Sequence, residues 1–178
     1  MPYQLDASHS HIGFAVKHMM ISTVRGQFRR YTAELEIDEQ DFTRSRFTGV
    51  IEVASIDTQE GQRDDHLRSG DFFDAEHHPT MTFKSSRIER KGDDYVVHGD
   101  LTIRGTTREV ALDVEYAGTS KDPWGNMRTG FSATGTIDRK DFGLTWNAAL
   151  ETGGILVGEK IKLHLDIEAV KQEAAVAI

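Results

Sequence analysis

Hydrophobic and polar residues alternate along most of this chain, a pattern of period two that is typical of β-strands with one buried face. Between residues 161 and 169, for example, Ile, Leu and Ala occupy every second position, and charged or polar residues lie between them. The alternation recurs in eight segments, of which the second is so long that we expect it to be bent: 12–18, 24–37, 51–53, 81–83, 97–103, 110–116, 131–137 and 161–169.

Helical periodicity is scarce. Residues 58–68 predict a short helix with Thr58 as its N-cap and Gly70 just beyond its end, and residues 138–144 predict a further helical turn. Because the outer face of each strand is polar, we expect antiparallel strands that are wet on one side. Eight such strands form a barrel or a sandwich, and their length favours the barrel. The predicted fold class is therefore all-β: an eight-stranded antiparallel barrel with one or two short helices.

Several small residues fall on the apolar faces of the predicted strands. Gly49, Gly99, Ala133 and Gly135 occupy positions where we expect side chains to point into the barrel. An eight-stranded barrel either fills itself with side chains or holds one small ligand, and small inward residues leave room for the ligand. Glycine also relieves strain in a strand, so the pattern indicates a cavity without requiring one.

Composition narrows the class of protein further. The chain has 178 residues, enough for one domain, which we place at residues 1–171, with a frayed Ala-rich tail at 172–178. A formal net charge of −8 argues against nucleic-acid binding, and the absence of cysteine excludes disulfides and thiol catalysis. No segment is long and apolar enough to span a membrane. The N-terminus lacks a signal-peptide pattern, which predicts a cytoplasmic protein, or a periplasmic or secreted one if a leader was removed.

Motifs for catalysis are absent: the sequence contains no nucleophile elbow, phosphate-binding loop or zinc-protease motif. His9 and His11 have the spacing of a metal-binding pair on an extended chain, but a third ligand is not evident, so we predict that no metal is needed. Arg63 and Asp64 suit either the acid–base pair of an enzyme or a hydrogen-bonded lock that fixes the short helix to the barrel end. We favour the lock.

Taken together, these segments resemble the YceI-like family, the polyisoprenoid-binding, lipocalin-like proteins. The resemblance covers nearly the whole chain and includes DASHS at 6–10 and VRGQF at 24–28. Its most specific part is SIDT at 55–58 followed by RDDHLRSGDFFD at 63–74. GDLTIRG at 99–105 and RKDFG at 139–143 complete the pattern. The order and spacing of these pieces, rather than any single one, carry the resemblance.

The resemblance implies a lipocalin-like barrel with a long apolar tunnel that binds an isoprenoid lipid, either a polyprenyl chain or an isoprenoid quinone, for storage, transport or sequestration. It also implies a homodimer. We expect that no cofactor is required and that the protein makes transient contact with a membrane. An enzyme that acts on a bound apolar substrate through His or the Arg63/Asp64 cluster is the alternative. We predict that the ligand is bound by Phe14, Val16, His18, Phe28, Leu35, Ile51, Val53, Met81, Phe83, Leu101, Ile103, Leu112, Val114, Phe131, Ala133, Trp146 and Leu163.

Overall fold

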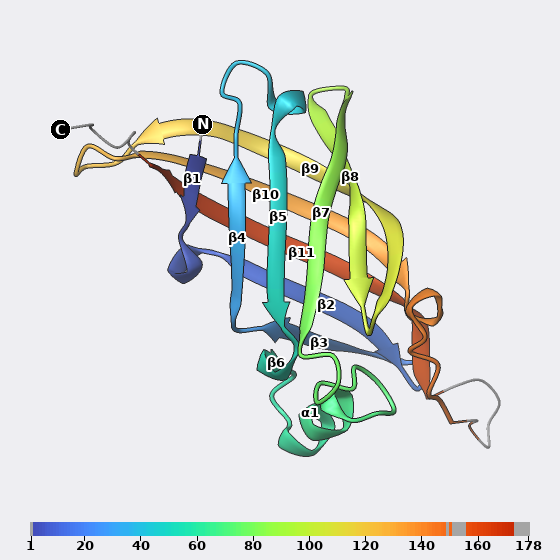
Figure 1. Ribbon diagram of the computed structural model, residues 1–178. Coiled ribbons are helices and arrows are strands. Elements are labelled where there is room, and N and C mark those ends of the chain that lie inside the picture. The colour runs from blue at the N-terminus through green and yellow to red at the C-terminus, as the bar shows by residue number, and fades with distance from the viewer. Residues whose placement is uncertain (1, 149, 151–155, 173–178) are drawn as a thin grey trace.

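A computed structural model describes residues 2–148, 150 and 156–172, and within these residues the strands form one antiparallel sheet that curls into a barrel (Figure 1). Gln172, the first residue of the expected tail, donates its backbone N–H to Pro2, and the rest of that tail lies outside the described residues. The strands are β1 (Pro2–Leu5), β2 (His11–His18), β3 (Ser22–Phe28), β4 (Tyr31–Glu36), β5 (Arg46–Glu52), β6 (Ile56–Asp57), β7 (Thr80–Lys91), β8 (Asp94–Ile103), β9 (Thr106–Lys121), β10 (Met127–Asp138) and β11 (Val157–Lys171).

The barrel closes because β11 pairs with both ends of the N-terminal segment. The C-terminal part of β11 pairs with β1, and its N-terminal part pairs with β2. β1 and β2 therefore act together as one interrupted strand of the barrel. Likewise, β3 pairs with β2 and β4 pairs with β1. The segment 24–37, predicted as one bent strand, is thus two strands that break at Arg29 and Arg30. The predicted eight-stranded antiparallel barrel is confirmed, with the ring β1-β4-β5-β7-β8-β9-β10-β11.

Helix α1 (Gly61–Arg68) and the loop that follows it lie at the lower end of the barrel in Figure 1, beside β6 and β7. Arg68 donates to the carbonyls of Ala54 and Ile56, and Arg104 donates to that of Phe72, so both the helix and the loop are tied to the strands. The helix begins two residues later than expected, with Glu60 as N-cap. No helix in the described part of the chain is long and apolar enough to cross a bilayer.

In the described residues, four single turns of 3-10 helix interrupt the strands. The fourth confirms the helical turn expected near residues 138–144, and the third contains Val53, which was predicted to lie in a strand. The alternation around Glu52 is therefore misleading, because the chain leaves the β-conformation immediately after this residue. The four turns are η1 (Ala7–His9), η2 (Phe42–Arg44), η3 (Val53–Ser55) and η4 (Arg139–Phe142).

Two clusters of buried side chains fill the two ends of the barrel. At the upper end in Figure 1, Phe42 of η2 stacks on Tyr116 with ring centroids 4.4 Å apart. At the lower end, the core includes Phe72, from the loop after α1, and Phe142 of η4. Phe83 and Leu163 are half-buried and pack against both clusters. Side chains from both clusters line the cavity inside the barrel.

Candidate ligand-binding cavity

An apolar cavity of about 230 Å³ lies inside the barrel. On β11 its lining runs from Val157 to Ile167, eleven residues that span about 33 Å along an extended strand. Residues on the described strands supply nearly all of the wall, since each presents alternate side chains to the interior. The cavity is therefore long and narrow, a shape that suits an extended chain better than a compact ring system.

Most of the predicted ligand-binding residues line this cavity, although whether they bind a ligand stays a prediction. Fourteen of the seventeen are part of the wall, and β-strands supply all of them. They are Phe14, Val16, Phe28, Leu35, Ile51, Met81, Phe83, Leu101, Ile103, Leu112, Val114, Phe131, Ala133 and Leu163.

His18, Val53 and Trp146 lie outside the lining. His18 follows the inward alternation of β2, but the wall ends one inward position earlier, at Val16. Val53 lies in η3 and is fully buried in the lower core, so no cavity surface reaches it. Trp146 packs edge-on against His66 of α1, with ring centroids 4.6 Å apart, and is not part of the wall.

Part of the wall comes from outside the strands and was not predicted. Leu67 on α1 and the neighbouring Phe72 and Phe73 close the lower end of the cavity. A pattern of period two cannot identify these residues, because a helix and a loop carry them. Their only sequence signal is that three large apolar residues occur in an otherwise polar segment.

The small residues that suggested a cavity have two different roles. Gly49 and Ala133 line the cavity, as expected. At Gly99 and Gly135, however, the space of the missing side chain is filled by neighbours. A Cβ atom at Gly135 would lie 2.8 Å from the Cδ2 atom of Leu112, and Gly135 is not part of the wall. Only some of the small inward residues therefore enlarge the interior.

Arg139 is the one charged residue in the described wall. Its side chain is buried and donates hydrogen bonds to four backbone carbonyls, those of Leu144, Trp146, Val157 and Gly158, at 2.8–3.2 Å. Its guanidinium also lies 5.9 Å from the centroid of the Phe72 ring. Burial lowers the pKa of this guanidinium from its usual value. Because its donors are directed at the backbone, Arg139 holds the chain segments around η4 together at the cavity end.

Arg63 and Asp64 form the expected lock, but they do so through Thr58 and not through each other. The buried Asp64 carboxylate accepts hydrogen bonds from the backbone N–H and the hydroxyl of Thr58. Arg63 donates to the hydroxyl and the carbonyl of the same residue, at 2.8 Å each. Thr58, predicted as the N-cap, is thus the anchor to which the first turn of α1 is bound. Neither charged group lines the cavity.

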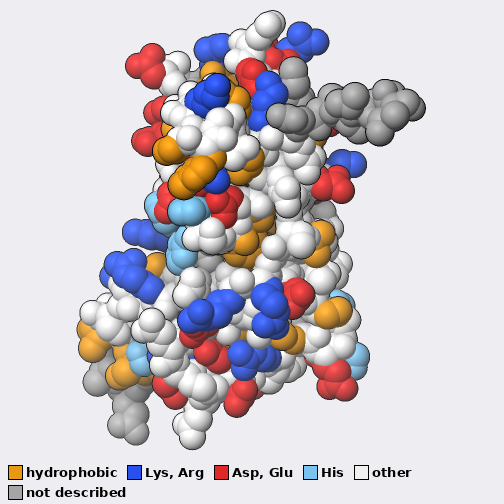
Figure 2. All heavy atoms as spheres, turned by 90° about the vertical axis from the view of Figure 1, so that its left-hand side faces the viewer, with side chains coloured by type: hydrophobic (Ala, Val, Ile, Leu, Met, Phe, Trp, Pro, Cys, Tyr) orange, Lys and Arg blue, Asp and Glu red, His pale blue; other side chains and the backbone are white. Residues whose placement is uncertain are grey.

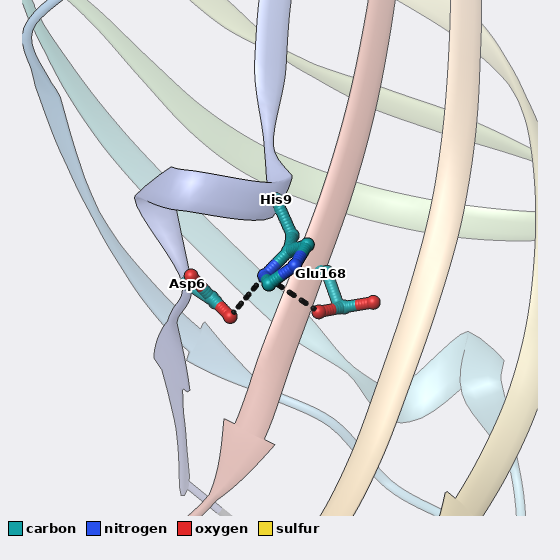
Figure 3. Close-up of side chains that lie close together, drawn as sticks. All are labelled: Asp6, His9 and Glu168. Atoms are coloured by element: carbon teal, nitrogen blue, oxygen red, sulfur yellow. Dashed lines mark hydrogen bonds and ion pairs between the residues drawn. The ribbon is translucent and has the colours of Figure 1, made fainter.

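Asp6, His9 and Glu168 bring three potential metal ligands within 4.8 Å of one another (Figure 3). His11, the other member of the predicted pair, lies on β2 and is not part of this group. Arg128 donates to the carboxylates of Asp6 and Glu168 at 2.9 and 3.1 Å, and so occupies the position of a cation. The hydrogen bond to Asp6 raises the pKa of His9, which favours imidazolium over a metal-binding imidazole. These contacts are those of an ion-pair network.

Comparison with known proteins places this architecture. The model of the YceI-like domain matches residues 3–169, from β1 almost to the end of β11. The chain belongs to the YceI-like family. A UPF0312 protein of Staphylococcus epidermidis is 43% identical over 167 residues, which cover 93% of this chain and 95% of the relative.

Solved structures share the YceI-like barrel. BcnA of Burkholderia cenocepacia has a TM-score of 0.79 at 25% identity, over 93% of this chain and 99% of that protein. A polyisoprenoid binding domain from Saccharophagus degradans, implicated in plant cell wall breakdown, has a TM-score of 0.69 over 96% of this chain and 98% of that one. Its identity is 16%, so this second likeness concerns the fold.

The segments that resemble the YceI-like pattern hold the barrel together. In the first, Asp6 joins η1 to β10 through Arg128. In the segment 63–74, Asp64 anchors α1 to Thr58. In the last, Arg139 binds the carbonyls that follow η4. The polar residues of these motifs thus build the frame, and the apolar residues between them build the cavity.

Proposed function

We propose that the protein binds one extended isoprenoid chain, a polyprenyl group or the tail of an isoprenoid quinone, in the cavity inside the barrel, and stores, carries or sequesters it. The observation that carries this proposal is the shape and chemistry of the cavity, which is long, narrow and almost entirely apolar. The likeness in fold to a polyisoprenoid binding domain from Saccharophagus degradans supports the same class of ligand. A homodimer and a cytoplasmic location stay predictions.

The physical basis of binding is the transfer of hydrocarbon out of water. Each buried CH₂ group contributes about 0.8 kcal/mol, so the affinity for an isoprenoid rises with every unit that enters the cavity. A polar anchor is not required for tight binding. The methyl-branched chain fits a wall of Leu, Ile, Val and Phe side chains, since these adapt to branches without leaving a polar group unpaired.

The composition of the wall favours binding over catalysis. Its described part contains no His, Asp, Glu, Lys or Ser residue, and its only hydroxyl groups are those of Tyr31, Thr32 and Thr48. Burial raises the pKa of Tyr31, which keeps its phenol protonated. Arg63 and Asp64, the alternative catalytic pair, are engaged by Thr58 outside the wall. This composition supports the binding of an apolar molecule over its chemical conversion.

Two measurements test the proposal. Mass spectrometry of an organic extract of natively purified protein is expected to show an isoprenoid in near-equimolar amount. Delipidated protein is then titrated with prenyl alcohols of increasing length, and the affinity is expected to rise until the cavity is full. Failure to recover lipid, together with no binding of added prenyl alcohols, would contradict the proposal.

A further inference from the structure

The turn between β2 and β3 presents three large apolar side chains to solvent. The exposed fractions of Met19, Met20 and Ile21 are 43%, 62% and 83%. Met19 and Met20 both have a left-handed backbone, with φ of 52° and 61°, the geometry of a type I′ turn. Asn and Gly adopt this backbone most easily, and neither is present here. The turn therefore carries apolar side chains where both exposure and backbone geometry disfavour them.

The hairpin that carries this tip is basic, although the chain as a whole is acidic. No Asp or Glu occurs between residues 7 and 33, whereas the chain has a net charge of −8. Lys17 on β2 and Arg25 on β3 are exposed and form no ion pair with any described residue. By contrast, acidic and basic side chains are interspersed over the face shown in Figure 2. The hairpin thus combines an apolar tip with unpaired positive charge.

The tip lies directly beyond one end of the cavity. Val16 of β2 and Val157 of β11 line the cavity, and Val157 pairs with His18, the last residue before the tip. The backbone N–H of Met19 donates to the carbonyl of Leu156 at 2.7 Å, which ties the tip to the start of β11. The tip therefore lies next to the end of the cavity wall that Val16 and Val157 form.

We propose that Met19, Met20 and Ile21 insert into the headgroup region of a bilayer that contains anionic lipid, with Lys17 and Arg25 facing the lipid phosphates. This inference rests on the proposed isoprenoid ligand, which resides in bilayers and has to be taken from one or delivered to one. Apolar side chains flanked by basic residues are the combination that binds membrane interfaces. Three side chains give a weak attachment, which suits a carrier that has to leave again.

A bilayer fits this feature better than a second copy of the chain. A stable protein interface buries about 800 Å² on each partner and needs a complementary surface. The tip of a hairpin is narrow and convex, and only three large apolar residues belong to it. A bilayer accepts such a tip without a preformed pocket, because lipids rearrange around it.

Sedimentation with vesicles tests the proposal independently of the ligand. The protein is mixed with isoprenoid-free vesicles of phosphatidylcholine alone, or of equal parts phosphatidylcholine and phosphatidylglycerol. We expect binding to the anionic vesicles that falls with added salt. The double variant Met20→Ser/Ile21→Ser is expected to lose at least tenfold in partition, and Lys17→Gln/Arg25→Gln to lose the preference for phosphatidylglycerol. Equal partition of wild type and the tip variant would overturn the proposal.

Trp124 provides the matched control. It is 81% exposed and lies in the turn between β9 and β10, which adjoins the opposite end of β11 from the tip. Trp124→Ser is expected to leave vesicle partition unchanged, and a loss as large as that of the tip variant would count against a role specific to the tip. Sedimentation velocity gives the second control, because a tip variant that loses self-association while keeping vesicle binding would show an interface between copies and overturn the proposal.

A prenyl alcohol added in solution separates this inference from the proposed function. The tip variant is expected to bind the alcohol as the wild type does, yet to take it up from vesicles at least tenfold more slowly. If neither protein binds the alcohol while the wild type still partitions to vesicles, the proposed ligand is wrong and the membrane contact stands. If both bind the alcohol and take it up from vesicles at the same rate, the tip has no part in transfer.

Discussion

The ring of Phe83 lies in the space that a side chain at Gly99 would need. A Cβ atom at Gly99 would overlap the Cζ atom of Phe83 and would be 2.6 Å from the carbonyl oxygen of Lys84. Gly99→Ala is therefore expected to displace both the ring and the backbone of β7. Overpacking of this kind costs about 1–3 kcal/mol in the free energy of unfolding, measured by chemical denaturation.

Gly49→Ala is the matched control for this substitution. A Cβ atom at Gly49 would meet nothing closer than 3.9 Å, and the residue lines the cavity. The change is expected to leave stability unchanged or to raise it by about 0.5–1 kcal/mol, since alanine restricts the unfolded chain. Equal losses from both substitutions would show that Gly99 is not specifically matched to Phe83.

Ala133 distinguishes a hollow barrel from a filled one. It lies on β10 between Val114 and Leu165 of the neighbouring strands, and it lines the cavity. Ala133→Leu is expected to leave the melting temperature of the ligand-free protein almost unchanged, because the added methylenes enter open space. The same change is expected to weaken binding of long prenyl alcohols more than that of short ones, as measured by titration.

The control for Ala133→Leu is Ala111→Leu on β9, whose side chain is exposed. It is expected to alter neither the melting temperature nor the affinity for any chain length. In a filled core, overpacking at Ala133 would cost about 1–3 kcal/mol, and each kcal/mol would lower the melting temperature by about 2–4 °C. A drop of that size in the ligand-free protein would contradict an open cavity.

Substitutions of Asp64 and Leu67, which lie on the same helix, are expected to affect different properties: stability in the first case and ligand binding in the second. Asp64→Ala leaves the N–H and hydroxyl of Thr58 without their acceptor, which costs about 1–3 kcal/mol of stability. Ligand affinity is expected to change little in this variant, provided it is measured at a temperature where the protein is folded. Leu67→Ala removes part of the cavity wall and is expected to weaken prenyl-alcohol binding. A folded Asp64→Ala protein that has lost only ligand binding would reverse the assignment.

The Asp6–His9 pair makes stability depend on pH in two directions. The hydrogen bond to Asp6 raises the pKa of His9, so its contribution is present below about pH 6.5 and is lost as the pH rises through the folded value. Hydrogen bonds from Ser8, His9 and Arg128 lower the pKa of Asp6, whose contribution is present above about pH 3.9 and is lost as the pH falls through the folded value. The pair is therefore most stabilising between these limits.

Titration of the imidazoles by NMR tests this network. Asp6→Asn is expected to lower the pKa of His9 toward its ordinary value, because the main acceptor loses its charge. His77, whose pKa is raised by a hydrogen bond to Asp74, is the internal reference and is expected not to change. A His9 pKa that is unaffected by Asp6→Asn would show that the two side chains do not interact in solution.

Most of the strands, and fourteen of the residues that line the cavity, could be predicted from alternation alone. The short strands β1 and β6 fall outside the predicted segments. In a closed barrel each strand has one inner face, so Leu112 and Val114 had to point inward once their strand was recognised. The contribution of Leu67 could not be predicted, because it depends on where α1 packs. The role of Gly99 could not be predicted either, since it depends on the register between β7 and β8, which places Phe83 beside it.

Contacts between distant parts of the sequence were equally hidden. Asp6 and Arg128 form an ion pair because β1 and β10 both pair with β11. The sequence around each residue contains no signal of this pairing. The position of Thr58 before a helical segment predicts a helix cap. In the structure, the Asp64 carboxylate reaches back from the first turn of α1 to accept hydrogen bonds from Thr58. The chain between the two residues includes Gln59, which has a left-handed backbone with φ of 65°.

The pairing of β11 with β10 on one side and with β1 and β2 on the other sets the order of events during synthesis on the ribosome. Until residues 157–171 have emerged, β2 and β10 are unpaired edges and the inner faces of the earlier strands cannot be enclosed. Closure is therefore a late, long-range step, of the kind that makes folding slow. A nascent chain stalled before Val157 presents exposed strand edges that favour aggregation. The interior forms only after β11 has left the ribosome, so a ligand can be enclosed only after that point.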